Sequence, residues 1–489
     1  MNILFAAAEA APFVKVGGLG DVAGTLPRYL RNRGHDVRIV LPRYGAIDRE
    51  RFGLSAIPGP LGVPMGSSGT LWCEILEGRL PGSDIPVYFL ERRDLFDRSG
   101  VYDDPSGKGY GDNAFRFLFL SRGALETARR LSFSPRVIHV HDWHTAAVPL
   151  YLDALYRRDP LLERSATVLT IHNLEHQGIF PRELMDILGT GWQHFHTGDL
   201  EFYNEVNLLK SGIIHGDAVS TVSPTYAGEM TTPEFGCRLD GVLRTYAPDL
   251  TGILNGVDYE EWNPEKDPWI FQPYGSDDLS GKGKNKADLQ TALGLPVAEG
   301  VPVVGMVTRL VHQKGMDVVA SVIHRLLDLG IQMVLLGSGE SWAHDFFSAV
   351  ASERPDRFAC RLGYDPVLAH RIIAGSDLFL MPSRFEPCGL TQMFALRYGT
   401  LPVVRAVGGL NDTVENFDGA TGAGTGFKFY DLTGDAVVNT LSWALSVFRE
   451  SPDTVTALRK RAMSRRFSWE DTARQYELLY RRAAEKRED

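Results

Sequence analysis

The chain alternates short apolar runs with longer segments in which apolar residues recur at helical spacing. Residues 22–34 are typical of the second kind and end at a glycine. Strands that alternate with helices indicate parallel sheets covered by helices on both faces, so we expect an α/β fold. The expected strands are 2–8, 36–42, 87–91, 136–142, 167–173, 218–224, 301–309, 332–339, 358–364, 378–383 and 401–406.

The alternation is interrupted between Asn263 and Lys286, where proline, glycine and charged residues predominate. It restarts afterwards, and 489 residues are too many for one ordinary core, so we expect a domain boundary beside this segment. Two doubly wound domains would present the carboxyl ends of their strands to a shared cleft, where such folds bind ligands. The expected domains are 1–250 and 251–465, followed by a C-terminal helix over 466–489.

This last helix begins at a sequence that resembles a capping box, Ser468 to Asp471. An apolar stripe follows on one face, so the helix is expected to pack against another element. The stripe consists of Trp469, Ala473, Tyr476, Tyr480 and Ala483.

Composition and charge argue against a nucleic-acid-binding protein and against a membrane protein. The formal charge of −10 gives no basic surface for nucleic acid, and no apolar run approaches the length that crosses a bilayer. The first residues lack the basic start of a signal peptide, and Glu9 interrupts their apolar run. Four cysteines without metal-binding spacing are typical of a reducing cytosol, so we expect a cytoplasmic protein that binds neither membranes nor nucleic acid.

A glycine-rich loop, Lys15 to Gly24, follows the first expected strand. Such a loop allows backbone N–H groups to approach an anion, although it could also be only a tight turn. A dinucleotide-binding unit should end its second strand in an acid for the ribose hydroxyl. Here that strand ends in Leu41, Pro42 and Arg43, which argues against a nicotinamide cofactor.

Polar side chains gather at the ends of two further strands. His139 and His141 alternate on one strand, and Asp142 and His144 follow. A metal site is conceivable, but no further ligand is evident, and His139 is expected in the core. Asp142, at the carboxyl end of its strand, is the better functional candidate. His172 and Asn173 end the next strand, where a polar pair is oddly placed for packing alone.

In the second half, Arg309 and Lys314 follow a strand and precede a glycine. Two cations in this position suit phosphate binding, although a solvated pair on a loop would look the same. Gly337 belongs to a second glycine turn at a strand end. Glu386 precedes a helix expected to open at Leu390, so its carboxylate could accept sugar hydroxyls or simply cap that helix.

Six motifs occur together in one order. They are KVGGLGDV at 15–22, HDWH at 141–144, HNLxxQG at 172–178, NGVD at 255–258, RLxxQKG at 309–315 and SRFEPCGLTQ at 383–392. Over essentially its full length the chain therefore resembles bacterial glycogen synthases and the plant starch synthases. The resemblance implies a GT-B fold of two Rossmann-like domains, with the last helix crossing back to the first. It also implies retaining transfer of glucose from ADP-glucose to the non-reducing end of an α-1,4-glucan, without cofactor or metal.

The resemblance also implies roles for particular residues. Arg309 and Lys314 would bind the diphosphate and stabilise it as it leaves, and Glu386 would contact the transferred glucose. His172 would lie near the anomeric carbon and Asp142 beside the acceptor. The implied substrate-binding residues are Lys15, Gly17, Gly18, Gly20, Asp21, Asn173, Asn255, Gly337, Tyr364, Cys388, Gly389, Leu390 and Thr391.

Many members of the wider superfamily carry a second glutamate eight residues after the first, where this chain has Phe394. Glycogen synthases usually have an aromatic residue there, which favours the narrower family. The alternatives are a transferase of the same fold that uses another nucleotide sugar, a glucan phosphorylase with lysine-bound pyridoxal phosphate, or a non-catalytic glucan-binding protein. Intact Lys15, Arg309, Lys314 and Glu386 argue against the last of these.

Overall fold

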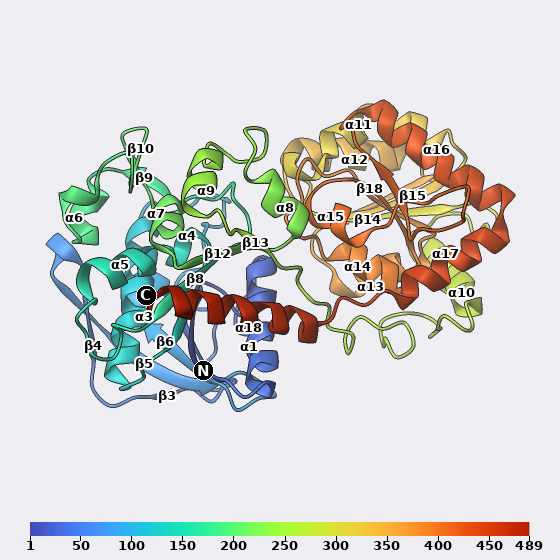
Figure 1. Ribbon diagram of the computed structural model, residues 1–489. Coiled ribbons are helices and arrows are strands. Elements are labelled where there is room, and N and C mark those ends of the chain that lie inside the picture. The colour runs from blue at the N-terminus through green and yellow to red at the C-terminus, as the bar shows by residue number, and fades with distance from the viewer. Residues whose placement is uncertain (489) are drawn as a thin grey trace. The chain divides into compact units, whose positions relative to one another are not determined.

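A computed structural model describes residues 1–488, and these form two compact units (Figure 1). Unit 1 consists of Met1–Val222, Ala227–Ile253 and the C-terminal segment from Trp469. Unit 2 consists of Ser223–Tyr226 and Leu254–Ser468. Among the described residues, no helix is both long and apolar enough to cross a membrane.

Unit 1 is built on a 10-stranded sheet in the order β13-β12-β8-β7-β1-β2-β6-β5-β3, with β4 also paired to β5. From β13 to β6 all neighbours are parallel, whereas β5 is antiparallel to β6, β3 and β4. The strands are β1 (Asn2–Ala6), β2 (Asp36–Pro42), β3 (Ser55–Ala56), β4 (Leu61–Pro64), β5 (Thr70–Arg79), β6 (Pro86–Glu91), β7 (Val137–His141), β8 (Ala166–Ile171), β12 (Ala218–Thr221) and β13 (Thr251–Gly252).

The antiparallel β5 corrects the expectation of a purely parallel sheet. Its sequence, TLWCEILEGR, alternates buried with exposed positions over much of its length. A strand near the edge of a sheet needs only one apolar face, so it lacks the continuous apolar run that marks the buried strands.

Helices cover both faces of this sheet (Figure 1). Unit 1 also contains a separate small sheet in the order β10-β11-β9. Its strands are β9 (Ile179–Pro181), β10 (Glu201–Phe202) and β11 (Glu205–Asn207). The helices of this part of the chain are α1 (Gly18–Asn32), η1 (Gly66–Ser68), α2 (Arg93–Phe96), α3 (Asn113–Arg130), α4 (Asp142–Thr145), α5 (Ala147–Leu155), α6 (Leu184–Leu188), η2 (Trp192–His194), α7 (Leu208–His215), α8 (Pro224–Glu229) and α9 (Asp240–Tyr246).

The last helix, α18 (Trp469–Lys486), packs against α1, β7, β8 and β12 (Figure 1). Its apolar stripe is buried from Trp469 to Ala483. Tyr480 also provides a polar anchor, because its hydroxyl lies 2.8 Å from Nδ1 of the buried His139 on β7. The other nitrogen of His139 lies 2.6 Å from Thr170 Oγ1, so this histidine is a core residue, as the sequence indicated.

Unit 2 contains a six-stranded, fully parallel sheet in the order β16-β15-β14-β17-β18-β19. Its strands are β14 (Val303–Val307), β15 (Gln332–Gly337), β16 (Phe358–Leu362), β17 (Leu378–Met381), β18 (Leu401–Arg405) and β19 (Phe427–Phe429). Its helices are α10 (Ser280–Ala292), η3 (His312–Lys314), α11 (Met316–Leu327), α12 (Ser341–Glu353), α13 (Pro366–Gly375), α14 (Thr391–Arg397), α15 (Gly408–Thr413), α16 (Gly434–Glu450) and α17 (Pro452–Ser464).

The segment that interrupts the sequence pattern is anchored in unit 2. Asp267 is buried and accepts hydrogen bonds from the Tyr398 hydroxyl (2.5 Å) and from Nδ1 of His370 (2.7 Å). Trp262, just before the segment, is stacked between His370 and Phe394, with ring centroids 3.8 and 3.9 Å away. Phe394 therefore packs against Trp262, at the position where many members of the wider superfamily carry a glutamate.

Candidate active site

In unit 1 the predicted site residues follow three neighbouring parallel strands. Lys15 and the glycine loop come after β1, Asp142 after β7, and His172 after β8. Because parallel strands end at the same edge of a sheet, the fold gathers these segments there. This edge is the unit 1 part of the candidate site.

A buried carboxylate holds the glycine loop in place. Oε2 of Glu9 accepts the backbone N–H groups of Val16 (2.5 Å) and Gly17 (3.0 Å). Its Oε1 accepts the hydroxyl of Tyr102 (2.5 Å), and burial raises the pKa of Glu9. Sequence reasoning treated Glu9 only as an interruption of an apolar run, because nothing in AAAEAAP points to the loop seven residues later.

The four glycines of the loop differ in the space that a side chain would have at each position. A side chain at Gly24 would lie 2.2 Å from the carbonyl oxygen of Ala11, and one at Gly20 would crowd Glu9 and Lys15. Gly17 and Gly18 have open space around the position of a side chain. Gly20 and Gly24 therefore permit close packing, whereas Gly17 and Gly18 leave room above the start of α1.

Lys15 is half-exposed, and its Nζ lies 2.7 Å from Oδ1 of Asp21 on α1. Burial raises the pKa of Asp21, and the positive charge of Lys15 opposes this shift. The ion pair therefore ties the ammonium group of Lys15 to the first turn of α1.

Asp142 adopts a left-handed backbone conformation, with φ 50°, which is uncommon for residues other than glycine. Its Oδ1 accepts the backbone N–H groups of His172 (2.6 Å) and Asn173 (3.4 Å). Burial raises the pKa of the Asp142 carboxyl to about 7, although both hydrogen bonds lower it. The structure thus joins the two polar clusters that the sequence placed on separate strands.

The imidazole of His172 lies 3.1 Å, Nε2 to Nδ1, from His141. Burial lowers the pKa of His172 to about 3, so the ring is neutral at physiological pH. The other nitrogen of His141, Nε2, is buried and has no hydrogen-bond partner among residues 1–488. Sequence reasoning did not assign a role to His141, which supports His172 from the neighbouring strand.

In unit 2, Arg309 and Lys314 lie on the loop that follows β14. The loop turns into α11 at Gly315, where φ is 70° and a side chain would meet the carbonyl oxygen of Pro382 at 2.0 Å. Arg309 is exposed, and its guanidinium donates to Oε1 of Gln313 (2.8 Å). The backbone carbonyl of Gln313 accepts the N–H of Arg384 (2.9 Å), which joins this loop to the loop after β17.

Glu386 is buried, and Lys314 Nζ donates to both of its carboxylate oxygens, at 2.7 and 2.6 Å. Ser383 Oγ donates to Oε2 at 2.8 Å. The alternative that Glu386 caps the next helix is wrong. That helix, α14, begins at Thr391 after Leu390 in the cap position, and the Glu386 carboxylate faces Lys314 and Ser383 instead.

The backbone around Glu386 is held by two glycines that start α15. A side chain at Gly408 would lie 2.0 Å from the carbonyl oxygen of Glu386, and one at Gly409 would lie 1.9 Å from that of Cys388. The N–H of Gly409 donates to the Glu386 carbonyl at 3.0 Å. Sequence reasoning missed both glycines, because they are about twenty residues away along the chain.

The Cys388 thiol is buried, which raises its pKa to about 12, while the backbone N–H of Asn255 lowers it. Oδ1 of Asn255 is buried, and no described residue forms a hydrogen bond with it. A side chain at Gly337, the last residue of β15, would lie 1.9 Å from the carbonyl oxygen of Thr308. Tyr364, after β16, is 91% exposed.

The unit 2 residues thus follow adjacent strands, β16, β15, β14 and β17, at the carboxyl edge of their sheet. Two α/β units that carry a buried acid, two cations and a glycine loop at the carboxyl edges of their sheets are typical of a sugar-transferring enzyme of the GT-B class. Family models agree. The starch synthase catalytic domain matches residues 2–245, and glycosyl transferases group 1 matches residues 294–447.

The chain belongs to the glycogen synthase family. It is 54% identical over 487 residues to "Glycogen synthase 1" of Geobacter sulfurreducens, covering 100% of this chain and 97% of the relative. It is 49% identical to "Glycogen synthase" of Anaeromyxobacter dehalogenans, covering 99% of both chains. It is therefore a glycosyltransferase of the glycogen and starch synthase type.

A solved structure supports the same assignment. The catalytic domain of starch synthase IV from Arabidopsis thaliana, bound to ADP and acarbose, matches with a TM-score of 0.90 and 37% identity over 99% of both chains. A sucrose-phosphate synthase from Thermosynechococcus elongatus matches with a TM-score of 0.60, 17% identity and 98% coverage of both chains. At that identity the second match shows a shared fold only.

Proposed function

We propose that this enzyme transfers glucose from ADP-glucose to the non-reducing end of an α-1,4-glucan and retains the anomeric configuration. The observation that carries the proposal is the cluster of buried Glu386 and Ser383 with partly buried Lys314, whose loop also carries exposed Arg309. It combines a carboxylate for a sugar with cations for a diphosphate. The starch synthase that bound ADP and acarbose supports the choice of donor and acceptor.

In this proposal unit 2 binds the nucleotide sugar. Arg309 and Lys314 neutralise the diphosphate as the bond to glucose breaks, and no metal ion is required for that charge. Gly337 lets the backbone lie close to the phosphates, while exposed Tyr364 offers its ring to the adenine. Asn255, Gly389, Leu390 and Thr391 line the sugar with Cys388.

Unit 1 in turn provides the acceptor side and part of the donor site. Lys15 adds positive charge to the diphosphate, with Gly17, Gly18, Gly20 and Asp21 shaping the loop around it. Asp142 lies beside the acceptor hydroxyl, and Asn173 supports the glucose. The four free cysteines fit the cytoplasmic location expected from the sequence.

The chemical step is proposed to proceed on one face of the sugar. His172 is neutral, because burial lowers its pKa to about 3, so it can orient a hydroxyl or carbonyl group but cannot act as a cationic acid. As the C–O bond to the diphosphate breaks, positive charge develops on the glucose ring near Glu386. The acceptor hydroxyl oxygen forms the new bond to the anomeric carbon from the face that the diphosphate leaves, so the configuration is retained, and the departing phosphate oxygen takes the hydroxyl proton.

Glycogen incubated with ADP-[14C]glucose or UDP-[14C]glucose tests the proposal. We expect label in the polymer from ADP-glucose at a rate at least tenfold higher than from UDP-glucose. Digestion by an enzyme specific for α-1,4 linkages should release the label, which establishes retention. Comparable rates with both donors would overturn the adenine assignment, and a β-linked product would overturn the proposed chemistry.

A further inference from the structure

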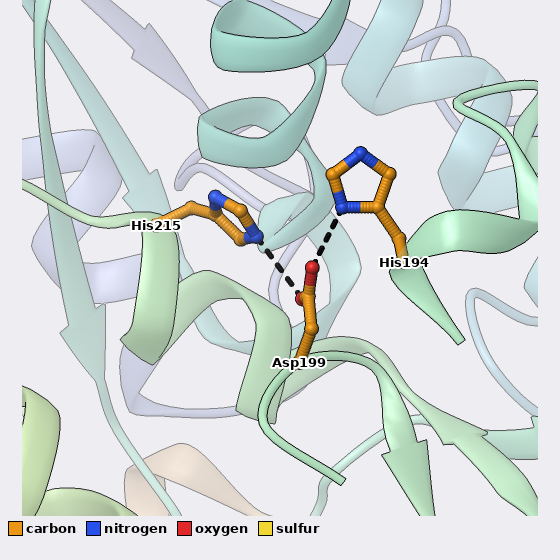
Figure 2. A group of neighbouring side chains, drawn as sticks. All are labelled: His194, Asp199 and His215. Atoms are coloured by element: carbon orange, nitrogen blue, oxygen red, sulfur yellow. Dashed lines mark hydrogen bonds and ion pairs between the residues drawn. The ribbon is translucent and has the colours of Figure 1, made fainter. Parts of the chain in front are cut away.

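Two histidines and an aspartate meet in unit 1, outside the site described above (Figure 2). His194 ends η2, Asp199 lies in the loop before β10, and His215 ends α7. Nδ1 of His194 lies 2.7 Å from Oδ2 of Asp199, and Nε2 of His215 lies 3.0 Å from Oδ1. Each oxygen of one carboxylate therefore faces a different imidazole.

The three potential ligand atoms lie within 4.8 Å of one another. Asp199 is buried, whereas both histidines are only partly exposed. A tetrahedral ion with bonds of about 2.0–2.2 Å holds its ligand atoms about 3.3–3.6 Å apart. The two N···O contacts, at 2.7 and 3.0 Å, would need to open by a few tenths of an ångström to about one ångström. The other ligand-atom separations, which are within 4.8 Å, would need to close by at most about 1.5 Å, and side-chain rotation can supply both changes.

The surroundings resemble the outer shell of a metal site. Nδ1 of His215 lies 3.3 Å from Oδ2 of Asp153 on α5, and a ligating histidine commonly donates its second N–H to such a carboxylate. The loop that carries the other two ligands is fixed from within, because the N–H of Leu200 donates to the carbonyl of His194 (3.2 Å). Lys210 further anchors it by donating to the carbonyls of Thr197 and Glu201.

We propose that His194, Asp199 and His215 bind a divalent transition-metal ion, with water as the fourth ligand. Two imidazoles and one carboxylate are a ligand set that suits Zn²⁺. The ion would join the 191–200 loop to the end of α7. Its role is to stabilise unit 1, and no step of glucosyl transfer passes through it.

The competing account is an ion-pair network without metal. Asp153 and Asp199 together raise the pKa of His215 to about 9 against the opposing effect of burial, so the protonated ring could bridge the two carboxylates unaided. The metal site predicts that each chain binds one ion, whereas the ion-pair network predicts no stoichiometric metal binding.

The test uses the full-length protein, freed of metal by chelation and then titrated with Co²⁺ and Zn²⁺. We expect one ion per chain, a visible absorption band of tetrahedral Co²⁺ and a rise of several degrees in Tm with Zn²⁺. Asp199→Asn and His194→Gln should weaken binding by about 100-fold or more. His196→Gln removes an exposed imidazole of the same loop, and the glutamine oxygen can replace Nδ1 as acceptor of the Gly198 N–H, so this variant should bind metal like the wild type.

Because the Co²⁺ spectrum is read on the wild-type protein, the test does not depend on the folding of a variant. If the wild type does not bind one metal ion per chain, the proposal is overturned in favour of the ion-pair network. The same holds if His196→Gln loses as much metal affinity as Asp199→Asn and His194→Gln. EDTA should lower Tm while turnover with the sugar donor persists at temperatures below melting. Loss of turnover in the still-folded, metal-free enzyme would contradict the purely structural role.

Discussion

At the end of β7, Asp142 has φ 50° and a carboxyl whose pKa burial raises to about 7. Both features cost stability and are typical of residues retained for function. In the unfolded chain the carboxyl ionises near its ordinary value, so the folded protein holds this proton more tightly. Stability contributed by the protonated group therefore falls as pH rises from about 4 to about 7 and stays low above that.

Asp142→Asn should accordingly be more stable than the wild type at pH 8, by an amount on the order of 1–4 kcal/mol. Asparagine tolerates the left-handed backbone, and its Oδ1 can still accept the N–H of His172. The gain should shrink at pH 5, where the wild-type carboxyl is protonated, and kcat should fall at both pH values.

Thermal melts at the two pH values and steady-state kinetics measure these effects. Asp277→Asn, at an exposed aspartate, serves as the control. A variant with unchanged Tm at pH 8 would contradict the burial argument, and unchanged kcat would remove Asp142 from the site.

Sequence reasoning found residues whose signal is local and missed those whose partners are distant. Asp142 stands directly after β7 and Glu386 a few residues after β17, both inside distinctive motifs. Glu9 binds a loop that begins several residues later, and Gly408 fits against Glu386 only in three dimensions. Such contacts leave no periodic pattern in the sequence.

The C-terminal helix α18 packs against the sheet of unit 1. One of its buried polar contacts joins the Tyr480 hydroxyl to Nδ1 of His139, at 2.8 Å. Tyr480→Phe leaves a nitrogen of His139 without its partner, which should cost about 1–3 kcal/mol. We expect Tm to fall by a few degrees while kcat stays close to that of the wild type.

Differential scanning calorimetry with parallel kinetics tests this prediction. Tyr203→Phe removes the same atom from a side chain that is 70% exposed and should leave Tm unchanged. Equal Tm values for the two variants would show that the hydroxyl does not anchor the helix.

Buried central strands were predicted well because they are continuous apolar runs. For example, 36–42 was predicted and β2 spans Asp36–Pro42. The amphipathic β5 and the short β19 were missed, because a strand with one exposed face or three residues does not stand out from loops. The apolar stripe of the last helix predicted that it would pack, but periodicity alone does not name the partner.

At the scale of the whole molecule, each unit is a doubly wound sheet with polar groups at its carboxyl edge. The proposed reaction needs groups from both, since Lys15 belongs to unit 1 and Arg309, Lys314 and Glu386 to unit 2. The family assignment rests on nearly the entire chain, which is why the six motifs could indicate it from sequence alone. The metal-binding cluster gave no such signal, because its three residues lie in no recognisable motif.

In the proposed reaction, the charge of Glu386 stabilises the transferred glucose in the transition state. Glu386→Gln preserves the shape, and its amide oxygen can still accept from Lys314 and Ser383. The amide nitrogen cannot accept the second bond from Lys314, and the ammonium loses its counter-charge, so Tm should fall while the variant remains folded. We expect kcat with ADP-glucose to fall by roughly a hundredfold or more, equivalent to about 3 kcal/mol, with a smaller change in the donor KM.

Steady-state kinetics of Glu386→Gln, with the melting temperature measured in parallel, is the most direct test. Glu353→Gln, at an exposed glutamate of the same unit, controls for the substitution itself. The account predicts a folded variant with strongly reduced kcat beside a fully active control. A folded Glu386→Gln enzyme with near wild-type kcat would contradict it.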